Sequence, residues 1–348
     1  MRPIAFIVSP LLLILSGLVA AQSSPSALPS LTLLVAEKRG SQLAVVDPTA
    51  MKVLAHVPAA PTPHEVATDG RFAYLSTQGG PTITVVDLAT LKPVEGIDTG
   101  AMGQVHGLAV ADGKLYFTSE RARTVARWDP ATRKIDWIFG GGQGRTHLVR
   151  ISSDLSRIFT TNIASGTLSI IERVEPPAGR GGPNAAGRAG GGGGGAAAQP
   201  DWTITAVAAG AGAEGIAVSP DEKTVWTANV PARSLSIVDV AAKQLVDTIP
   251  VTTTYANRIA FTRDGRYVVA TDLRGPELTV FDVATRKEIK RIPIGGGSEG
   301  LIMAPDGRRV FVSGQVQNKL VIIDVATWTV SGEIAGLEGP DGLAWFGR

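Results

Sequence analysis

The stretch GIAVSPDEKTVWTANVPARSLSIVDVA, residues 215–241, contains the pattern that decides the fold. A short apolar strand (GIAV) precedes a turn, and a strand rich in β-branched and aromatic residues then ends at Asn229. After a polar loop, an alternating strand (SLSIVD) ends at Asp239. Alternation with a period of two is typical of β-strands rather than helices. The stretch therefore predicts three antiparallel strands joined by tight turns.

The same pattern occurs seven times along the chain. The alternating strand ends in an acid in each copy, with spacings of 40, 42, 43, 67, 43 and 42 residues: Asp47, Asp87, Asp129, Glu172, Asp239, Asp282 and Asp324. The strand before it always ends ten residues earlier: Glu37, Thr77, Ser119, Asn162, Asn229, Asp272 and Gly314. A fourth strand follows each acid. Four short antiparallel strands in a repeat of this length form one blade of a propeller. We therefore predict an all-β fold, a seven-bladed β-propeller of four-stranded antiparallel blades.

The ends of the repeat predict how the ring closes. Residues 31 to 58 supply only three strands of the first blade and lack its inner strand. Residues 341 to 346 form a lone inner strand at the other end of the chain. We expect this C-terminal strand to complete the first blade and close the ring by ladder hydrogen bonds.

Two segments lie outside the repeat. Residues 1–21 have Arg2, an apolar run and small residues before Gln22, which is the pattern of a cleavable signal peptide. The alternative is an uncleaved membrane anchor. Residues 22–30 form a linker and 31–348 the propeller. A Gly/Ala-rich tract, residues 176–200, interrupts the fourth blade; it cannot bury a core, so we expect it to be disordered.

Charge and composition limit the partners. The 33 basic and 31 acidic residues leave a net charge of +2, which does not suggest nucleic acid. We expect a monomer in the periplasm or outside the cell, with no transmembrane span after signal cleavage. Its partner would be an unknown protein or a small-molecule ligand.

The strands FTTN, WTAN and VATD, the phrase GIAVSPDEKTVWTAN and the endings VVDLAT and VIIDVAT resemble the YVTN-repeat family of β-propellers. The likeness covers nearly the whole mature chain and implies an exported, seven-bladed scaffold related to YncE-like proteins. The blades are also similar to those of 6-phosphogluconolactonase-type enzymes and of propeller subunits of periplasmic oxidoreductases. Likeness of fold does not carry an activity with it.

When the seven repeats are aligned, one column of equivalent positions holds side chains that can bind a ligand or take part in catalysis. The residue just before each inner strand is polar in every blade: His64, His106, His147, Glu214, Asn257, Glu299 and Asp341. Since inner strands surround the axis, we expect these residues to ring one mouth of the central channel. The histidines with Glu214 would hold a divalent transition metal, Zn or Cu. Glu299 or Asp341 would then act as a base or as a group that orients the substrate. The alternative is a solvated polar rim without a function.

Two arginines break the pattern of their columns. Arg150 stands three residues after His147, where most other blades have alanine. It is a candidate for catalysis or for binding an anion in the channel; alternatively it pairs with Glu65 or Glu214. Arg258 follows Asn257 directly, and Glu65, Asn257 and Arg258 are expected to form a ligand-binding rim.

Two functions remain open from the sequence. The first is a non-catalytic exported scaffold that binds a protein, a surface polymer or a small ligand. The second is a metal-dependent hydrolase, like the lactonases built on propellers, or a lyase of the streptogramin type. Convergence of His64, His106 and His147 would favour the second.

Overall fold

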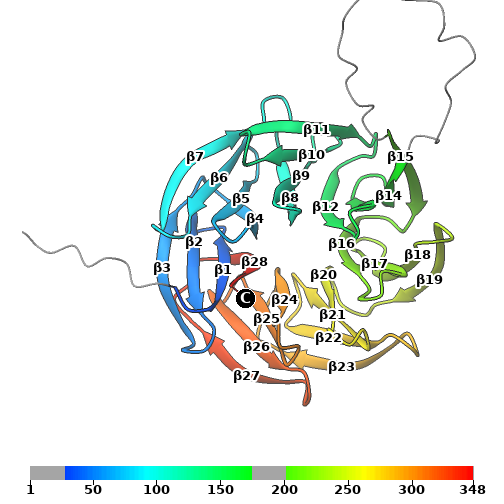
Figure 1. The fold of residues 1–348 in the computed structure, drawn as a ribbon. Helices are drawn as coiled ribbons and strands as arrows, with labels where there is room; N and C mark the ends of the chain where they lie inside the picture. Colours follow the sequence, from blue (N-terminus) through cyan, green and yellow to red (C-terminus); the bar gives the residue numbers. More distant parts are fainter. Residues whose placement is uncertain (1–27, 175–200, 348) are drawn as a thin grey trace, which may run out of the picture.

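The computed structural model describes residues 28–174 and 201–347. Over these ranges the strands form seven four-stranded antiparallel sheets around a central axis (Figure 1). The predicted seven-bladed β-propeller is therefore confirmed. The expected signal peptide (1–21) and the Gly/Ala-rich insertion (176–200) lie outside the described residues. In the part of the chain described, no helix is long and apolar enough to cross a bilayer.

Each blade runs from an inner strand at the axis to an outer strand at the rim. The inner strands, in blade order, are β28 (Pro340–Gly347), β4 (Pro63–Thr68), β8 (Val105–Ala111), β12 (Thr146–Ile151), β16 (Ala213–Val218), β20 (Ala256–Phe261) and β24 (Leu301–Met303). The second strands are β1 (Leu31–Glu37), β5 (Phe72–Thr77), β9 (Lys114–Ser119), β13 (Arg157–Asn162), β17 (Thr224–Asn229), β21 (Tyr267–Asp272) and β25 (Arg309–Gly314).

The third strands are β2 (Gln42–Asp47), β6 (Thr82–Asp87), β10 (Thr124–Asp129), β14 (Thr167–Val174), β18 (Ser234–Asp239), β22 (Glu277–Asp282) and β26 (Lys319–Asp324). The outer strands are β3 (Lys52–Pro58), β7 (Lys92–Asp98), β11 (Lys134–Gly140), β15 (Asp201–Ala208), β19 (Gln244–Pro250), β23 (Lys287–Pro293) and β27 (Thr329–Ile334).

In six of the blades the acid at the end of the third strand begins a turn, whereas in the fourth blade Glu172 lies within β14, opposite Thr203. Asp87 Oδ1 accepts hydrogen bonds from the backbone N–H groups of Ala89 and Thr90, at 2.9 and 3.0 Å. Leu91 then takes a left-handed φ of 53° and starts the way back to the outer strand. A short carboxylate suits this position because it satisfies the amides that the turn leaves free. The periodic acids therefore have a structural role.

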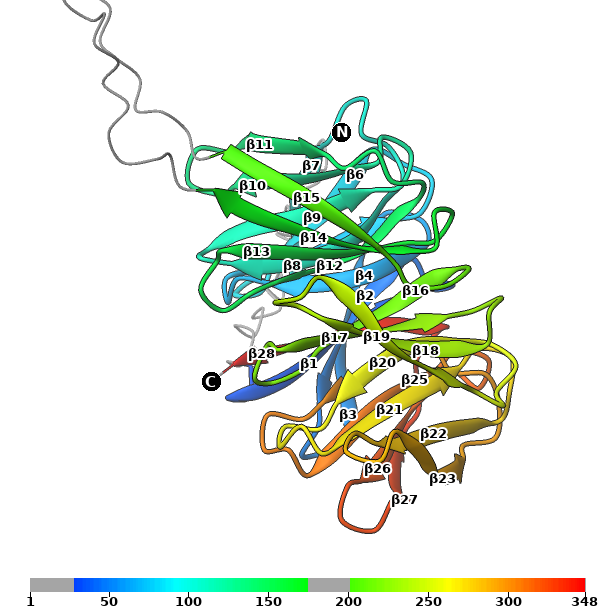
Figure 2. The same ribbon diagram turned by 90° about the vertical axis from the view of Figure 1, so that its right-hand side faces the viewer.

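Ring closure follows the prediction. β28 pairs antiparallel with β1, with Leu34 opposite Ala344, and the two strands lie side by side in both views (Figures 1 and 2). Glu37 at the end of β1 is fully buried, and its Oε1 accepts the N–H of Glu338 at 2.7 Å. The two ends of the propeller are thus joined through one complete blade.

The core is divided among the spaces between blades. The buried apolar side chains form seven clusters, and each cluster joins two neighbouring blades. One example packs Trp226 of β17 edge-on against Phe261 of β20, with ring centroids 5.7 Å apart. No blade buries both of its faces alone, so the ring folds as a unit and positions the channel residues rigidly.

Candidate metal centre

The predicted histidines lie at irregularities of the inner strands. Pairing of the inner with the second strand shifts register around His64, His106 and His147. Glu214 and Asn257 occupy the corresponding shifts of the next two blades. A β-bulge bends the strand and aims a side chain away from the ladder. The repeat itself therefore directs this column of residues toward the channel.

Close packing between neighbouring blades fixes the spacing of these residues. A Cβ on Gly107, which follows His106, would lie 2.5 Å from the carbonyl oxygen of His147. Thr118 on β9 accepts the Gly107 N–H at 2.8 Å and donates its hydroxyl to the same carbonyl. Three more glycines meet the backbone of the next blade in the same way: Gly215, Gly300 and Gly342. The close contact holds consecutive residues of the column side by side.

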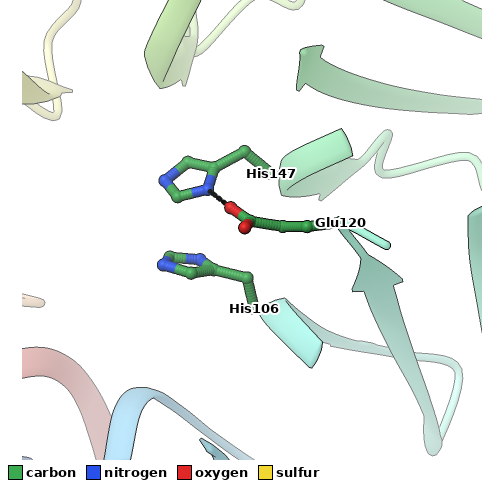
Figure 3. Close-up of side chains that lie close together, drawn as sticks. All are labelled: His106, Glu120 and His147. Carbon is green, nitrogen blue, oxygen red and sulfur yellow. Dashed lines mark hydrogen bonds and ion pairs between the residues drawn. The ribbon is translucent and has the colours of Figure 1, made fainter. Parts of the chain in front are cut away.

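The imidazoles come together and are buried. The rings of His106 and His147 have centroids 3.7 Å apart and planes at 32°, and His64 lies 5.1 Å from His106. Their exposed fractions are 4, 5 and 3% for His64, His106 and His147. They are therefore buried, whereas the alternative of a solvated polar rim requires exposed side chains. Figure 3 shows His106 and His147 pointing in the same direction, with Glu120 behind them.

Glu120 determines which nitrogen of His147 is free. Its Oε1 lies 2.6 Å from Nδ1 of His147, so the neutral ring carries its proton on Nδ1 and a lone pair on Nε2. That Nε2 is buried and has no hydrogen-bond partner. Burial lowers the pKa of His147 to about 4 despite Glu120, so the ring is neutral at pH 7. Burial, followed by the charge of His147, holds the pKa of His106 well below 6.5.

His64 has a different environment. Its Nδ1 lies 3.1 Å from Asp341 Oδ2, and its Nε2 lies 2.9 Å from Gln78 Oε1. Both nitrogens face acceptors, which favours the protonated ring. Burial lowers the pKa of His64, but the hydrogen bond to Asp341, the charge of Asp341 and the hydrogen bond to Gln78 together outweigh it, so the pKa is raised. His64 groups with Glu299 and Asp341, their candidate ligand atoms lying within 4.8 Å of one another.

The two carboxyl groups beside His64 are crowded. Lys38 Nζ lies 3.5 Å from Glu299 Oε1 and 3.7 Å from Asp341 Oδ2. Gln315 also donates to Glu299. Burial, and then the negative charge of Asp341, raise the pKa of Glu299 above its ordinary value. Glu299, one of the two predicted bases, is therefore a buried carboxyl group that loses its proton at a higher pH than an ordinary glutamic acid.

Arg258 holds two of the predicted site residues. Its Nη2 lies 2.7 Å from Glu65 Oε1, and its Nη1 lies 3.5 Å from Glu214 Oε1. Burial lowers the pKa of Arg258, but these two charges outweigh it and raise the pKa. Arg258, and not Arg150, is thus the partner of Glu65 and Glu214. Glu214 shares the cavity of the histidines but faces this guanidinium. Asn257 is fully buried and accepts the Thr271 hydroxyl at 2.8 Å.

Sequence reasoning missed a second ring of residues around the mouth. They directly follow the ends of the second strands: Lys38, Gln78, Glu120, Ile163, Val230, Leu273 and Gln315. Lys38, Gln78 and Glu120 contact the histidines or their carboxylates. The ten-residue register already identified the strand ends, so reading one position further along that register would have found this ring.

The mouth encloses a cavity of about 330 Å³ that His64, His106 and His147 line together with Glu214, Arg258 and Glu299. The ion pairs of this end involve five carboxyl groups, those of Glu65, Glu120, Glu214, Glu299 and Asp341. They face three cations, Lys38, Arg145 and Arg258, and His64, whose contacts favour the protonated ring. Because Glu299 holds its proton more tightly than an ordinary carboxyl group, the charges of this end are close to balance.

The family model "YNCE-like beta-propeller" matches residues 197–304, which include the fifth and sixth blades in full. This match and the seven-bladed ring support a YncE-like propeller family for the chain. No curated protein matches it in sequence.

Solved structures share the fold at low identity. A functionally unknown protein from Desulfotomaculum acetoxidans superposes with a TM-score of 0.70 at 12% identity, covering 90% of this chain and 98% of that one. A candidate 6-phosphogluconolactonase from Bacteroides uniformis gives a TM-score of 0.70 at 15% identity, covering 90% and 99%. The dihydro-heme d1 dehydrogenase NirN, in complex with DHE, gives a TM-score of 0.60 at 16% identity. This match covers 88% of this chain but only 64% of that chain. At such identities the likeness shows the fold alone.

Proposed function

We propose that this chain is an exported binding propeller that holds a divalent transition-metal ion, Zn²⁺ or Cu²⁺, at the histidine mouth. The observation that carries the proposal is the buried, unpartnered Nε2 of His147 beside the His106 ring. A buried polar atom without a partner is costly, and a metal ion would satisfy this one. The neutral imidazoles are already in the protonation state that metal binding requires.

Glu120 would orient a metal ligand rather than bind the metal itself. Metal-binding histidines usually donate their second N–H to a carboxylate, which fixes the tautomer and the ring orientation. Glu120 does this for His147, and Arg145 Nε lies 3.1 Å from its other oxygen, Oε2. His106 and His147 are therefore the proposed ligands and Glu120 the residue that positions them. The remaining coordination positions would face the cavity and be open to water or a ligand.

The experiment is metal analysis of the mature protein after dialysis against Zn²⁺ or Cu²⁺. We expect about one ion per chain, with His147→Ala abolishing stoichiometric binding and Glu120→Gln weakening affinity about 10- to 100-fold. His56→Ala is the matched control, because His56 lies on the outer strand β3 and pairs with Glu37. Wild-type protein without stoichiometric metal, or His147→Ala protein with undiminished metal, would overturn the proposal.

A metal-dependent hydrolase is the second candidate. The observation in its favour is Glu299, whose raised pKa suits a general acid or base in the same cavity. Hydrolysis of a simple lactone by the metal-loaded protein, lost in Glu299→Gln with metal still bound, would support this candidate. Metal binding with no such activity would leave the binding function alone.

A further inference from the structure

The opposite end of the channel has a cavity of about 730 Å³, with apolar side chains along its wall and polar groups between them. Its walls include Leu108, Val218, Phe261, Met303 and Trp345 from five blades. The volume is within the range of small-molecule sites, roughly 300 to 1,000 Å³. Apolar side chains from several blades, with polar groups between them, suit an amphiphilic ligand.

The guanidinium of Arg150 lies among the apolar side chains of this wall. The column that contributes alanine in most blades contributes Arg150 from β12. Its side chain is exposed to the channel, and its Nη1 donates to the carbonyl of Val149 at 2.8 Å. Among the ion pairs of the described residues, none involves Arg150. Most of its five N–H donors are therefore free for a ligand.

The other charged residues of this cavity are engaged elsewhere. Glu65 pairs with Arg258 at 2.7 Å, and Arg263 donates to the carbonyl of Pro305. The cavity thus has two arginines against one carboxylate, which Arg258 already neutralises. A single negative charge on a ligand would neutralise Arg150, whereas the charge of the exposed Arg263 is solvated.

We propose that this cavity is a second ligand site, which binds an amphiphilic monoanion with its carboxylate on Arg150 and its aliphatic chain along the apolar wall. The planar guanidinium fork matches a carboxylate in two parallel hydrogen bonds. The aliphatic chain of the ligand would be of medium length, because it must cover an open cavity rather than enter a closed tunnel. This site stands independently of the metal proposal, since it shares no proposed ligand residue with the histidine mouth.

The test is calorimetric titration of the mature protein with decanoate below its micelle concentration. We expect saturable one-to-one binding with a change in the fluorescence of Trp345, whose Nε1 is anchored to the Met303 carbonyl. Acetate lacks the chain and decanol lacks the charge, so each should bind at least about tenfold more weakly. Comparable binding of decanol would overturn the carboxylate assignment.

Two variants locate the site. Arg150→Ala should weaken decanoate binding about tenfold or more, and it should fold because alanine occupies this column in five other blades. Ala260→Trp should block binding by filling the cavity while leaving Arg150 intact, because Ala260 lines the cavity and is partly exposed. His147→Ala is the matched control and should bind decanoate normally. Undiminished binding in Arg150→Ala, or no saturable binding by the wild type, would overturn the proposal.

Discussion

The two ends of the channel are built from the same inner strands, yet they favour opposite ligands. The histidine mouth is small and rich in carboxylates, whereas the other end, here called the apolar end for the apolar side chains along its wall, is wider and carries the unpaired Arg150. On β12 the two kinds of residue, His147 and Arg150, stand only three positions apart. A short inner strand can therefore present one chemistry at each end of the ring.

The difference teaches where a propeller has freedom to vary. At the histidine mouth, bulges free the side chains while glycines such as Gly107 and Gly342 accept the backbone of the next blade. At the other end, small residues such as Ala67 and Ala217 leave space, and one large residue is enough to change the cavity. Arg258, between Glu65 of the apolar cavity and Glu214 of the polar one, connects the two ends electrostatically.

The largest effect should come from removing β28, because this strand contributes to both ends. Deleting residues 341–348 removes Asp341 from the polar mouth and Trp345 from the apolar cavity, and it exposes the edge of β1. We expect loss of the cooperative thermal transition and aggregation, since an unpaired edge strand pairs with other chains. Circular dichroism melting measures this. A truncated chain with the wild-type melting temperature would show that the ring does not depend on this closure.

The next effect concerns the connection between the two ends. Arg258→Met leaves Glu65 and Glu214 without their cation, and Arg258 is only 8% exposed. We expect the free energy of unfolding to fall by about 3 kcal/mol, the lower range for breaking a buried ion pair. Denaturant unfolding measures this value. Adding Glu65→Gln and Glu214→Gln to the variant should recover most of the loss; without such recovery, the arginine would stabilise the protein by packing alone.

The sequence predicted the fold well because the repeat is local. Strand ends, turn acids and the missing inner strand follow from spacing, and the structure confirms them except in the fourth blade, where β14 continues past Glu172 to Val174. The column containing His106 and His147 was also visible, since its position relative to the strands is constant. The pairing of side chains across blades was not. Glu65 pairs with Arg258 and not with Arg150, and Glu120 contacts His147. Both pairings depend on distances between blades, and the pattern within a single repeat gives no information on these distances.

The smallest effect is a pH dependence confined to the polar end. Glu299 is 6% exposed, and burial with the neighbouring Asp341 raises its pKa in the folded protein. As pH rises above the ordinary carboxyl pKa, the unfolded chain loses this proton first, so the folded state becomes less stable. Glu299→Gln removes this loss. In metal-free buffer we therefore expect the variant to gain on the wild type by about 1 to 3 kcal/mol between pH 5 and pH 8. Arg150→Gln at the apolar end is the control, because arginine stays protonated over this range and its difference from the wild type should be constant. Urea unfolding at both pH values measures the two differences. A Glu299→Gln difference that does not change with pH would mean that burial and the charge of Asp341 do not raise the pKa of this carboxyl group.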